Sequence, residues 1–395
     1  MKVLVLNCGS SSAKFQVLEM DDESLLAKGI VEKIGSSNAI LSYKPTGKPD
    51  FKRVEEILDH RRAVERVLTV LSDPEIGVIK DKAEISSVGH RVVHGGERFA
   101  ESTVIDEEVI HKIVICSEIA PLHNPHNLRG ILACRDLLPN IPQVAVFDTA
   151  FHQTMPPVAY IYGLPYVLYV RHQIRRYGFH GTSHYYVAHQ AAEIIGRPLN
   201  ELRIITAHLG NGASIAAVKY GKSIDTSMGF TPLEGLVMGT RCGDIDPAII
   251  PFIVEKEQLS VDGSNLMMQK HSGLLGISGV SSDLREVLKA RAEGNKRADL
   301  AVNIYSYRIR KYIGAYAAAM GGLDAIVFTG GVGENSDVIR ELSCQGLEFC
   351  GVILDPDANA AAATCISTGP VAVLVIPTNE ELVIARESKR LVPAV

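Results

Sequence analysis

Two apolar runs, each broken by a short polar turn, carry residue types suited to holding phosphate. The first run extends over residues 2–18 and turns at Asn-Cys-Gly-Ser-Ser-Ser, residues 7–12. The second extends over residues 204–218 and turns at His-Leu-Gly-Asn-Gly, residues 208–212. Such turns offer backbone N–H groups and hydroxyls to an anion. One such turn is usually an ordinary hairpin tip, but two of the same kind indicate a duplicated fold that closes on a nucleotide.

Two arginines in glycine-rich segments could bind a second anion. Arg91 stands in Gly-His-Arg-Val-Val-His-Gly-Gly, residues 89–96, and Arg241 stands in Gly-Thr-Arg-Cys-Gly, residues 239–243. The planar guanidinium group binds carboxylates and phosphates through two parallel hydrogen bonds. A single arginine is more often a member of a surface ion pair. Two of them, in a chain with phosphate-binding turns, suggest a second substrate that is itself an anion.

Two histidines and an aspartate also stand at turns or strand ends. His123 and His180 lie in loop-like segments rich in Gly and Pro, where an imidazole N–H could contact phosphoryl oxygens or make ordinary loop hydrogen bonds. His180 and His184 have the spacing of a zinc pair, but Gly181 stands where the metalloprotease pattern has glutamate. Asp148 ends an apolar strand, where open α/β sheets carry their chemistry; a turn or helix-cap aspartate is the alternative.

Acidic residues 380 and 381 follow the strand-like run 371–376 and could reach magnesium, although acids at a helix start are more common.

Two segments resemble known phosphate-binding motifs but do not match them. Segment 329–336 lacks the third glycine of the dinucleotide motif, and segment 216–223 has alanine where the P-loop requires glycine. Neither a nicotinamide site nor a P-loop is predicted.

Strand-like runs alternate with helical stretches, which predicts an α/β protein. The expected strands are residues 87–93, 143–147, 204–207, 325–329 and 371–376, and the expected helices begin at about residues 107, 183 and 296. Polar residues 44–52 are expected to form a surface loop or hairpin. The clearest boundary follows Asp148. We therefore expect domains at residues 1–150 and 151–381, with the chain rejoining the first domain at about 382–395.

Bulk composition narrows the class of protein. The 395 residues carry a net charge of −5, so nucleic acid, which needs clustered positive charge, is not an expected partner. Seven cysteines without a Cys-x-x-Cys pair indicate neither a zinc site nor a disulfide framework. No leader precedes the first strand, and no apolar run is long enough to span a membrane. We expect a soluble cytoplasmic protein.

The motifs, taken in order, resemble those of the acetokinase family, the acetate kinases, within the superfamily of acetate and sugar kinases, actin and heat-shock chaperones. The resemblance covers nearly the whole chain. The matching segments are residues 7–12, 89–96, 147–154, 176–184, 208–212, 225–229, 238–241 and 378–381.

This resemblance implies a fold and an activity. The fold would be α/β, a two-domain duplicated ribonuclease H-like (actin-like ATPase) fold with an active-site cleft between the domains. The chain would form a homodimer and use Mg²⁺, or Mn²⁺ in its place, with ATP to convert acetate reversibly into acetyl phosphate and ADP. Propionate or another short-chain acid is an alternative acceptor. A non-enzymatic actin-like nucleotide switch is the alternative of a different class, but it would not need Arg91, Arg241 and His180 around one anion.

The resemblance also assigns roles to individual residues. Those assigned to catalysis are Asp148, His180, Arg241, Arg91 and His123. Those assigned to the acyl substrate are Arg91, Val93 and Arg241, and those assigned to the metal are Asn7 and Glu380. Those assigned to ATP are Lys14, His208, Leu209, Gly210, Asn211, Gly212, Asp283, Leu284, Arg285, Gly331, Val332, Gly333, Glu334 and Asn335. Because acetate is already ionised near pH 7, no general base is needed, and Asp148 is expected to orient the site.

Overall fold

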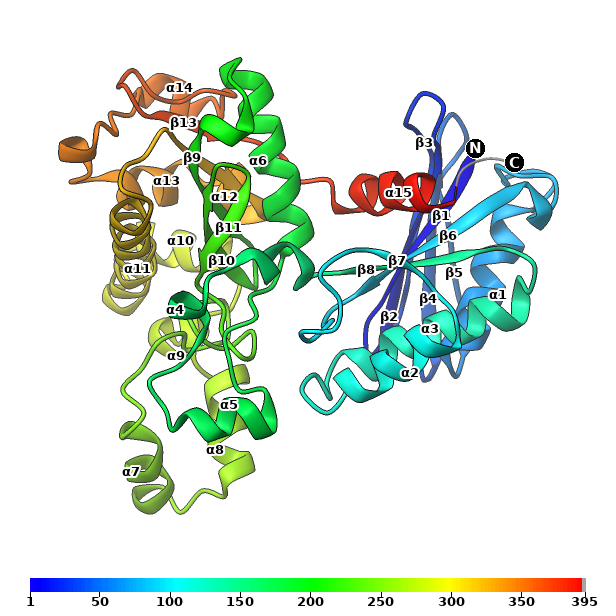
Figure 1. Cartoon of the computed structure of the whole chain (residues 1–395), viewed down its shortest axis with the longest axis horizontal. Helices are drawn as coiled ribbons and strands as arrows, with labels where there is room; N and C mark the ends of the chain where they lie inside the picture. The colour runs from blue at the N-terminus through cyan, green and yellow to red at the C-terminus, as the bar shows by residue number, and fades with distance from the viewer. Residues whose placement is uncertain (393–395) are drawn as a thin grey trace. The chain divides into compact units, whose positions relative to one another are not determined.

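The protein divides into two compact units, which Figure 1 shows in the computed structural model that describes residues 1–392. The first unit comprises Met1–Ala150 and the segment from Asn379 onward, and the second comprises Phe151–Thr378. The return to the first unit thus lies at Asn379, earlier than the expected residue 382. The physical reason is that Asn379 caps the last helix, accepting a hydrogen bond from Leu382 N, so the whole helix packs with the first unit.

The first unit contains an eight-stranded sheet with the order β5-β4-β3-β2-β1-β6-β8-β7. The strands are β1 (Lys2–Cys8), β2 (Ser12–Glu19), β3 (Ser24–Glu32), β4 (Ser36–Pro45), β5 (Phe51–Ile57), β6 (Ile85–Val92), β7 (Thr103–Val104) and β8 (Gln143–Phe147). Strands β1, β6 and β8 are parallel to one another, whereas β1, β2 and β3 are joined as antiparallel neighbours. The expected hairpin at residues 44–52 joins β4 to β5.

Helices cover both faces of this sheet. They are α1 (His60–Leu71), α2 (Glu107–Cys116), α3 (Asn124–Leu137) and α15 (Glu380–Leu391). Val88 of β6 belongs to the core that includes residues of α1 and α3, whereas the Cα of the next residue, Gly89, faces Ile384 of α15. Successive strand residues point to opposite faces, so α15 covers the face opposite to α1 and α3. A side chain at Gly89 would collide with Ile384 and Ser388, so α15 needs this glycine to pack closely.

The second unit contains a five-stranded sheet with the order β11-β10-β9-β12-β13. The strands are β9 (Arg203–Leu209), β10 (Ala213–Lys219), β11 (Lys222–Thr226), β12 (Ala325–Thr329) and β13 (Ala372–Val375). β9 pairs antiparallel with β10 and parallel with β12, which pairs parallel with β13. The segment rejected as a P-loop is the β10–β11 hairpin.

Both sheets repeat one topology. β1 corresponds to β9: each pairs antiparallel with the next strand along the chain and parallel with a strand that follows after a long connection. In each unit that parallel strand has a further parallel neighbour, β8 or β13. The order 3-2-1-4-5 therefore occurs twice, which confirms the predicted duplicated α/β fold.

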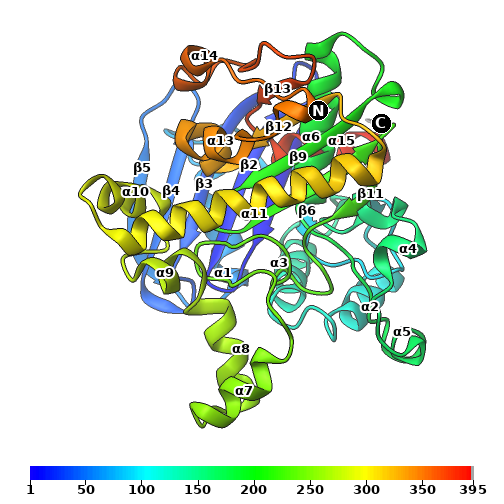
Figure 2. The same ribbon diagram turned by 90° about the vertical axis from the view of Figure 1, so that its left-hand side faces the viewer.

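The helices of the second unit are α4 (Pro157–Tyr160), α5 (Tyr166–His172), α6 (Gly181–Ile195), α7 (Ile249–Lys256), α8 (Val261–Lys270), α9 (Gly273–Ser278), α10 (Leu284–Ala292), α11 (Lys296–Met320), α12 (Gly330–Asn335), α13 (Asp337–Cys344) and α14 (Pro356–Ala360). Helix α11, the long yellow helix of Figure 2, packs on β9 and β10, and α6 packs on β9 and β12. Asn295 caps the start of α11, and Gly321, with a φ of 72°, ends it.

Two elements differ from expectation. Helix α6 begins at Gly181 rather than at about 183, because His180 adopts a left-handed backbone, with a φ of 56°, immediately before it. The glycine-rich segment 329–336 is not among the expected helices, but residues 330–335 form α12. No helix among residues 1–392 is long and apolar enough to cross a membrane.

Candidate active site

Half-buried Arg91 and buried Asp148 form an ion pair at the edge of the first sheet. Arg91 lies near the end of β6, and Asp148 directly follows β8, the parallel neighbour of β6. The carboxyl ends of parallel strands lie at one edge of a sheet, which brings the two side chains together. Arg91 Nε and Nη2 donate to the two carboxylate oxygens over 3.0 and 2.5 Å, and the Asp148 residue is 1% exposed. Asp148 therefore holds the guanidinium plane in one orientation.

The charges around Arg91 favour a bound cation. Burial lowers the pKa of Arg91, but the negative charges of Asp148 and Glu380 outweigh burial and raise it overall. Burial raises the pKa of Glu380 above its ordinary value, while the positive charges of Arg91 and Lys14 act against that rise. Glu380 is thus a half-buried carboxylate whose ionised form further positive charge would stabilise.

Asn7 connects this pair to the first predicted phosphate turn. It lies in β1 opposite Lys14 of β2, and its Oδ1 is 3.5 Å from Arg91 Nη1. The turn between the strands is closed by a hydrogen bond from Gly9 N to Ser12 O over 2.8 Å. The exposed Lys14 side chain is therefore placed on the strand that leaves the turn.

Two side chains that sequence analysis did not single out shape the same turn. His60, at the start of α1, is buried, and its Nε2 lies 2.7 Å from Gly9 O. A carbonyl oxygen only accepts, so the proton of this bond is on Nε2. Asn127 Nδ2 donates to Cys8 O over 2.7 Å, and its Oδ1 accepts from Val93 N over 3.0 Å. In the sequence, the only indication of this role was an asparagine shortly after Pro125, within what the structure shows to be helix α3. Its partners lie 34 and 119 residues away along the chain, so local sequence patterns do not reveal them.

Val93 and His123 also lie in the first unit. Val93 immediately follows β6 and is buried, at 8% exposure, within two residues of Arg91. His123 is the residue before α3 and is half-buried, with its backbone N–H bonded to Ala120 O over 3.1 Å. Asn124 joins α3 to the same strand end, since its side chain bonds both backbone groups of His94.

In the second unit, His180 and Arg241 converge on the second predicted phosphate turn. A Cβ built on Gly212 would lie 3.5 Å from Arg241 Nη1 and 3.8 Å from His180 Nε2. The His180 ring stacks on the ring of His208 with centroids 4.3 Å apart. The left-handed backbone of His180 is uncommon for a residue with a side chain, and such conformations cluster at functional sites.

Other predicted nucleotide-binding segments surround the same turn. A Cβ on Gly239 would collide with Asn211 Oδ1, and Gly239 N donates to Asn211 O over 3.1 Å. The backbone oxygen of Ser282, next to Asp283, lies 2.9 Å from that same Cβ position. A Cβ on Gly330, whose φ is 75°, would lie 2.8 Å from Leu209 O. Glycine is thus required where these backbones meet.

Helix α12 is fixed by buried polar contacts. Glu334 Oε1 accepts from Gly330 N over 2.9 Å, so this carboxylate closes the start of the helix. Arg340, which sequence analysis missed, is 1% exposed, and its Nη1 donates to Gly333 O and Glu334 O over 2.9 and 3.0 Å. Asn359 supplies its remaining acceptors. Gly331 and Val332 lie in the first turn of the helix.

The other predicted ATP residues stand at the start of α10. Asp283 caps this helix by accepting from Arg285 N over 2.9 Å, and it also pairs with the exposed Arg285 guanidinium. That side-chain hydrogen bond lowers the pKa of Asp283 to about 2. Leu284 is 6% exposed and packs inward. Its side chain is therefore placed for the core, in contrast to its two neighbours.

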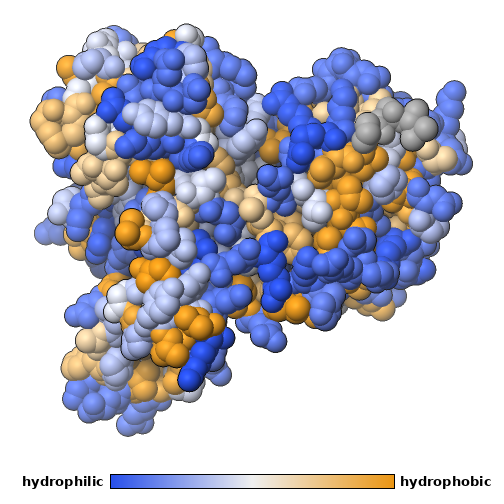
Figure 3. All heavy atoms as spheres, in the orientation of Figure 1, coloured by the Kyte–Doolittle hydropathy of each residue, from blue (hydrophilic) through white to orange (hydrophobic). Residues whose placement is uncertain are grey.

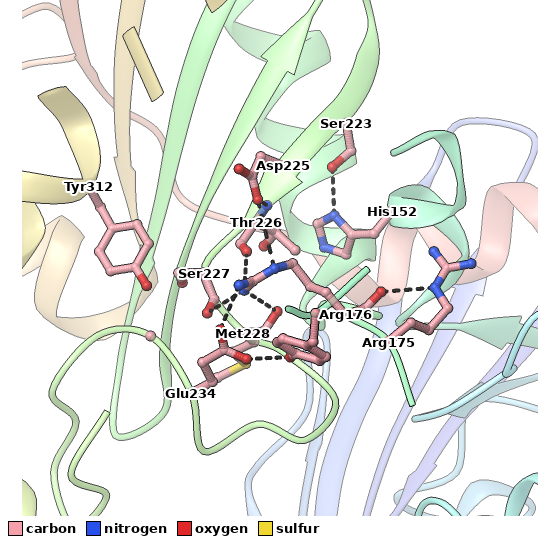
Figure 4. Close-up of polar contacts among 12 residues, drawn as sticks. His152, Arg175, Arg176, Ser223, Asp225, Thr226, Ser227, Met228, Glu234 and Tyr312 are labelled. Carbon is pink, nitrogen blue, oxygen red and sulfur yellow. Dashed lines mark hydrogen bonds and ion pairs between the residues drawn. The ribbon is translucent and has the colours of Figure 1, made fainter. Parts of the chain in front are cut away.

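The segment that carries Arg241 has no regular secondary structure between residues 227 and 248, yet partly buried charged side chains hold it (Figure 4). Arg176 Nη1 donates to the backbone oxygens of residues 226, 227 and 228 over 2.8, 3.1 and 3.3 Å, and its Nη2 to Glu234 over 2.5 Å. Tyr162 also donates to Glu234. Burial lowers the pKa of Arg176, but the Glu234 charge outweighs burial and raises it.

The far end of this segment is anchored in the same way. Asp244 accepts from Gly235 N over 2.8 Å and from the Tyr312 hydroxyl over 2.7 Å. Arg241 Nη1 donates to Pro232 O over 3.1 Å. Arg176 therefore contributes to the position of Arg241 through the backbone that it holds.

The residues present fit magnesium better than zinc. The half-buried carboxylate of Glu380 acts electrostatically on Arg91, and the amide oxygen of Asn7 lies 3.5 Å from it. Mg²⁺ binds one or two such oxygens together with water and phosphate. The zinc reading of His180 and His184 does not fit, because Nδ1 of the first and Nε2 of the second both bond Ser214 Oγ over 2.8 Å. Among residues 1–392 no group of three or more His, Cys, Asp or Glu could hold a metal.

Comparison with known proteins identifies the family. Residues 2–386 match the model of the acetokinase family. The chain belongs to this family. It is 57% identical to acetate kinase of Caldanaerobacter subterraneus subsp. tengcongensis over 400 residues, which covers 100% of both chains. It is 56% identical to acetate kinase of Alkaliphilus metalliredigens, covering 99% of this chain and 100% of the relative.

Solved structures agree with this assignment. The crystal structure of Porphyromonas gingivalis acetate kinase superimposes with a TM-score of 0.95 at 52% identity, covering 99% of each chain. A propionate kinase from Francisella tularensis superimposes with a TM-score of 0.93 at 44% identity, again covering 99% of each chain. The recognition of the family from its motifs is confirmed.

Proposed function

We propose that this protein transfers the γ-phosphoryl group of ATP to acetate, reversibly, giving acetyl phosphate and ADP. The observation that carries this proposal is full-length similarity, at 56–57% identity, to relatives named acetate kinase. The site supports it, because a phosphoryl acceptor that is itself a carboxylate needs a fixed cation. Arg91, oriented by Asp148 at a sheet edge, is such a group.

Phosphoryl transfer from ATP to acetate requires no proton transfer. One acetate oxygen forms a bond to the γ-phosphorus while the bond from that phosphorus to the β,γ-bridging oxygen breaks, and its electron pair leaves on ADP. Acetate is ionised near pH 7, because carboxyl pKa values are about 4. In this direction Asp148 therefore acts by orienting Arg91 rather than as a base.

Arg91 would bind the acetate carboxylate, and Arg241 and His180 would stabilise the equatorial oxygens of the transferred group. Positive charge and N–H donors aimed at those oxygens lower the barrier most when they are fixed before reaction. The convergence of Arg241 Nη1 and His180 Nε2 on Gly212 supports this role. His123, before α3, would contact the phosphoryl group from the first unit.

The nucleotide would lie against the second unit. Its phosphates would contact the turn at residues 208–212 and the start of α12, and Lys14 would reach them from the first unit. Asp283–Arg285 and residues 331–335 would contact the nucleoside. The meeting of Asn211, Gly239 and Ser282 supports this assignment.

Glu380 and Asn7 would hold Mg²⁺, with Mn²⁺ as a substitute. The cation supplies charge neutralisation to the phosphate oxygens when bound. Glu380 would contribute a carboxylate to that cation; burial raises its pKa, and the positive charges of Arg91 and Lys14 act against that rise.

A hydroxamate assay tests the function directly. Purified protein with ATP, Mg²⁺ and acetate is expected to form acetyl phosphate, which hydroxylamine traps, and Arg241→Ala is expected to lose most of this activity. Lys222→Ala, an exposed change in the β10–β11 hairpin, serves as the control. ATP binding without acyl phosphate formation from acetate, propionate or butyrate would instead favour the actin-like switch.

Val93 is proposed to wall the methyl pocket beside Arg91. A β-branched residue there would favour acetate, but one methylene is worth only about 1–3 kcal/mol of discrimination, so slower turnover of propionate is expected. We predict that Val93→Ala raises the propionate-to-acetate ratio of kcat/KM by roughly tenfold. If that ratio stays unchanged, Val93 does not line the pocket.

We also propose a homodimer in the cytoplasm. Exposed apolar residues gather on the second unit over α5, α7 and α8, the lower left part of Figure 3. They include Tyr166, Val167 and Val170 of α5, Phe252 of α7 and Leu266 of α8. Burial of such residues between subunits would stabilise a dimer. Light scattering of wild type and Val170→Glu gives the masses, and cell fractionation gives the compartment.

A further inference from the structure

We propose that Ser214 and His184 are positioning residues that set the tautomer of His180, so that its Nε2 carries the proton. The inference rests on the proposed phosphoryl-transfer function, in which the Nε2 end of His180 faces the reacting group. It adds two residues to the site and a defined direction to their hydrogen bonds.

A continuous chain of side-chain hydrogen bonds runs inward from His180. His180 Nδ1 lies 2.8 Å from Ser214 Oγ, Ser214 Oγ lies 2.8 Å from His184 Nε2, and His184 Nδ1 lies 2.7 Å from Thr206 Oγ1. Ser214, His184 and Thr206 are all 0% exposed. The chain connects α6 with β10 and β9. Water does not reach these groups, so their hydrogen bonds must be satisfied within the chain.

The hydrogens available on these side chains allow two directions for the hydrogen bonds of the chain. Burial lowers the pKa of His184 well below its ordinary value, so its ring is neutral, with one N–H and one acceptor nitrogen. Ser214 has a single hydroxyl hydrogen, so it donates to one histidine and accepts from the other. Either all donors point toward His180, or all point away from it.

Thr206 decides between the two directions. Among residues 1–392, the hydrogen-bond partner found for its hydroxyl is His184 Nδ1. If His184 Nδ1 donated, the fully buried Thr206 hydroxyl would keep a hydrogen without an acceptor, which carries the full desolvation cost of that donor. Thr206 therefore donates to His184 Nδ1, and His184 Nε2 donates to Ser214. The Ser214 hydroxyl then donates to His180 Nδ1, which leaves the His180 proton on Nε2.

A neighbouring pair shows the same pattern with a fixed direction. His152 Nε2 lies 3.0 Å from Phe179 O and its Nδ1 lies 2.7 Å from Ser223 Oγ, as Figure 4 shows for the serine. The carbonyl only accepts, so Nε2 donates, and burial lowers the pKa of His152 to about 4. Ser223 thus donates to His152 Nδ1. This pair is a matched control for the pair of Ser214 and His180.

The direction suits the proposed chemistry. With the proton on Nε2, neutral His180 offers an N–H donor at the end of the ring that adjoins Gly212 and Arg241. The opposite tautomer would present a lone pair to phosphoryl oxygens, which is repulsive. Stacking on His208 and the left-handed backbone hold the ring, and Ser214 fixes which nitrogen carries the hydrogen.

Nitrogen-15 NMR of the ligand-free protein tests the inference without relying on activity. Protein with ¹⁵N-labelled histidine is compared with the variant His180→Gln, which assigns the His180 signals by their loss among those of the 13 histidines. In wild type at pH 7.5, Nδ1 of His180 is expected at the position of an unprotonated ring nitrogen, and Nε2 at that of a protonated one. A proton on Nδ1 of wild-type His180 overturns the inference; the tautomer is measured on the wild-type protein, and His180→Gln serves only to assign its signals.

The variant Ser214→Ala removes the hydroxyl donor. The His180 signals are expected to move toward a mixture of tautomers, and kcat for acetyl phosphate formation to fall about tenfold with acetate and ATP KM changing less than twofold. Ser223→Ala is expected to move the His152 signals and leave those of His180 in place. Unchanged His180 signals in folded Ser214→Ala would show that Ser214 does not set the tautomer.

The outcomes separate this inference from the proposed function. Absence of acetyl phosphate formation by wild type contradicts the function, whatever the tautomer. If the wild type is active but His180 carries its proton on Nδ1, only the inference about the His180 tautomer is contradicted. If the His180 signals change equally in Ser214→Ala and Ser223→Ala, the cause is a general loosening of the core. That result would also overturn the inference about the His180 tautomer.

Discussion

At the scale of single residues, Arg91 has most of its hydrogen-bonding capacity directed by its neighbours. Asp148 takes Nε and Nη2, and Asn7 lies near Nη1. Arg91 was chosen from sequence because it stands in a glycine-rich strand end. Its pairing with Asp148, 57 residues later, could not be chosen in that way, because it depends on β6 and β8 being neighbours.

Replacing Arg91 tests its assignment to the acyl site. Arg91→Ala is expected to raise the acetate KM by roughly tenfold to a hundredfold, since hydrogen bonds between charged groups contribute about 1.5–3 kcal/mol. The ATP KM should change much less. Steady-state kinetics with each substrate varied gives both values, and Arg203→Ala, which removes an ion pair to Asp324, is the control. Equal increases in both KM values would remove Arg91 from the acyl site.

The role of Asp148 is tested by removing its charge but not its shape. Asp148→Asn is expected to lower kcat by about a hundredfold, because the amide no longer accepts both Arg91 donors and the guanidinium loses its fixed orientation. The loss should be the same at every pH between 6 and 9. Recovery of activity at high pH would show proton transfer instead, since hydroxide would then replace the missing base.

At the scale of elements, the two sheets share one strand topology, and each places candidate site residues at corresponding strand ends. β1 and β9 each lead into a predicted phosphate turn; of the parallel strands beside them, β6 carries Arg91 near its end and β12 leads into α12. These strands were predictable because their residues are apolar on both faces. β8, β12 and α11 have the expected bounds. Helix α12 was missed, because three glycines in six residues oppose a helix and its contacts with Arg340 come from tertiary structure.

Arg176 is predicted to act on the segment that carries Arg241. Arg176→Lys keeps the charge but cannot reach three backbone oxygens and Glu234 at once, so the segment should loosen. We expect kcat to fall roughly tenfold to a hundredfold. The melting temperature should also fall. Arg203→Lys, at another arginine–carboxylate pair of the same unit, is the matched control. A normal kcat in a destabilised Arg176→Lys would confine its role to stability.

At the scale of the whole molecule, buried neutral histidines make stability depend on pH. Burial lowers the pKa of His90 and of His152 to about 4, and it lowers the pKa of His184 well below its ordinary value. In the unfolded chain they would titrate near 6.5. Between these values the unfolded state binds more protons than the native state, so stability falls as pH falls.

Urea unfolding at several pH values measures this dependence. Each such histidine is expected to remove up to about 1.4 kcal/mol of unfolding free energy per pH unit below pH 6.5. Circular dichroism is the suitable probe, because the chain has no tryptophan. His90→Asn should reduce the slope, and His111→Gln, at an exposed position, should leave it unchanged. Equal stability at pH 7 and pH 5 would contradict the prediction.

The sequence by itself determined the α/β class and the family, and it predicted the two phosphate turns and most residues of the candidate site. These are local signals: apolar runs, glycine at turns, and motifs within a few residues of each other. Only the tertiary structure decided that Asp148 holds Arg91, that Arg176 holds the segment of Arg241, and that Thr206, His184 and Ser214 act on His180. Those contacts join residues from different strands and helices, so they depend on which elements become neighbours when the apolar faces of the two sheets are buried.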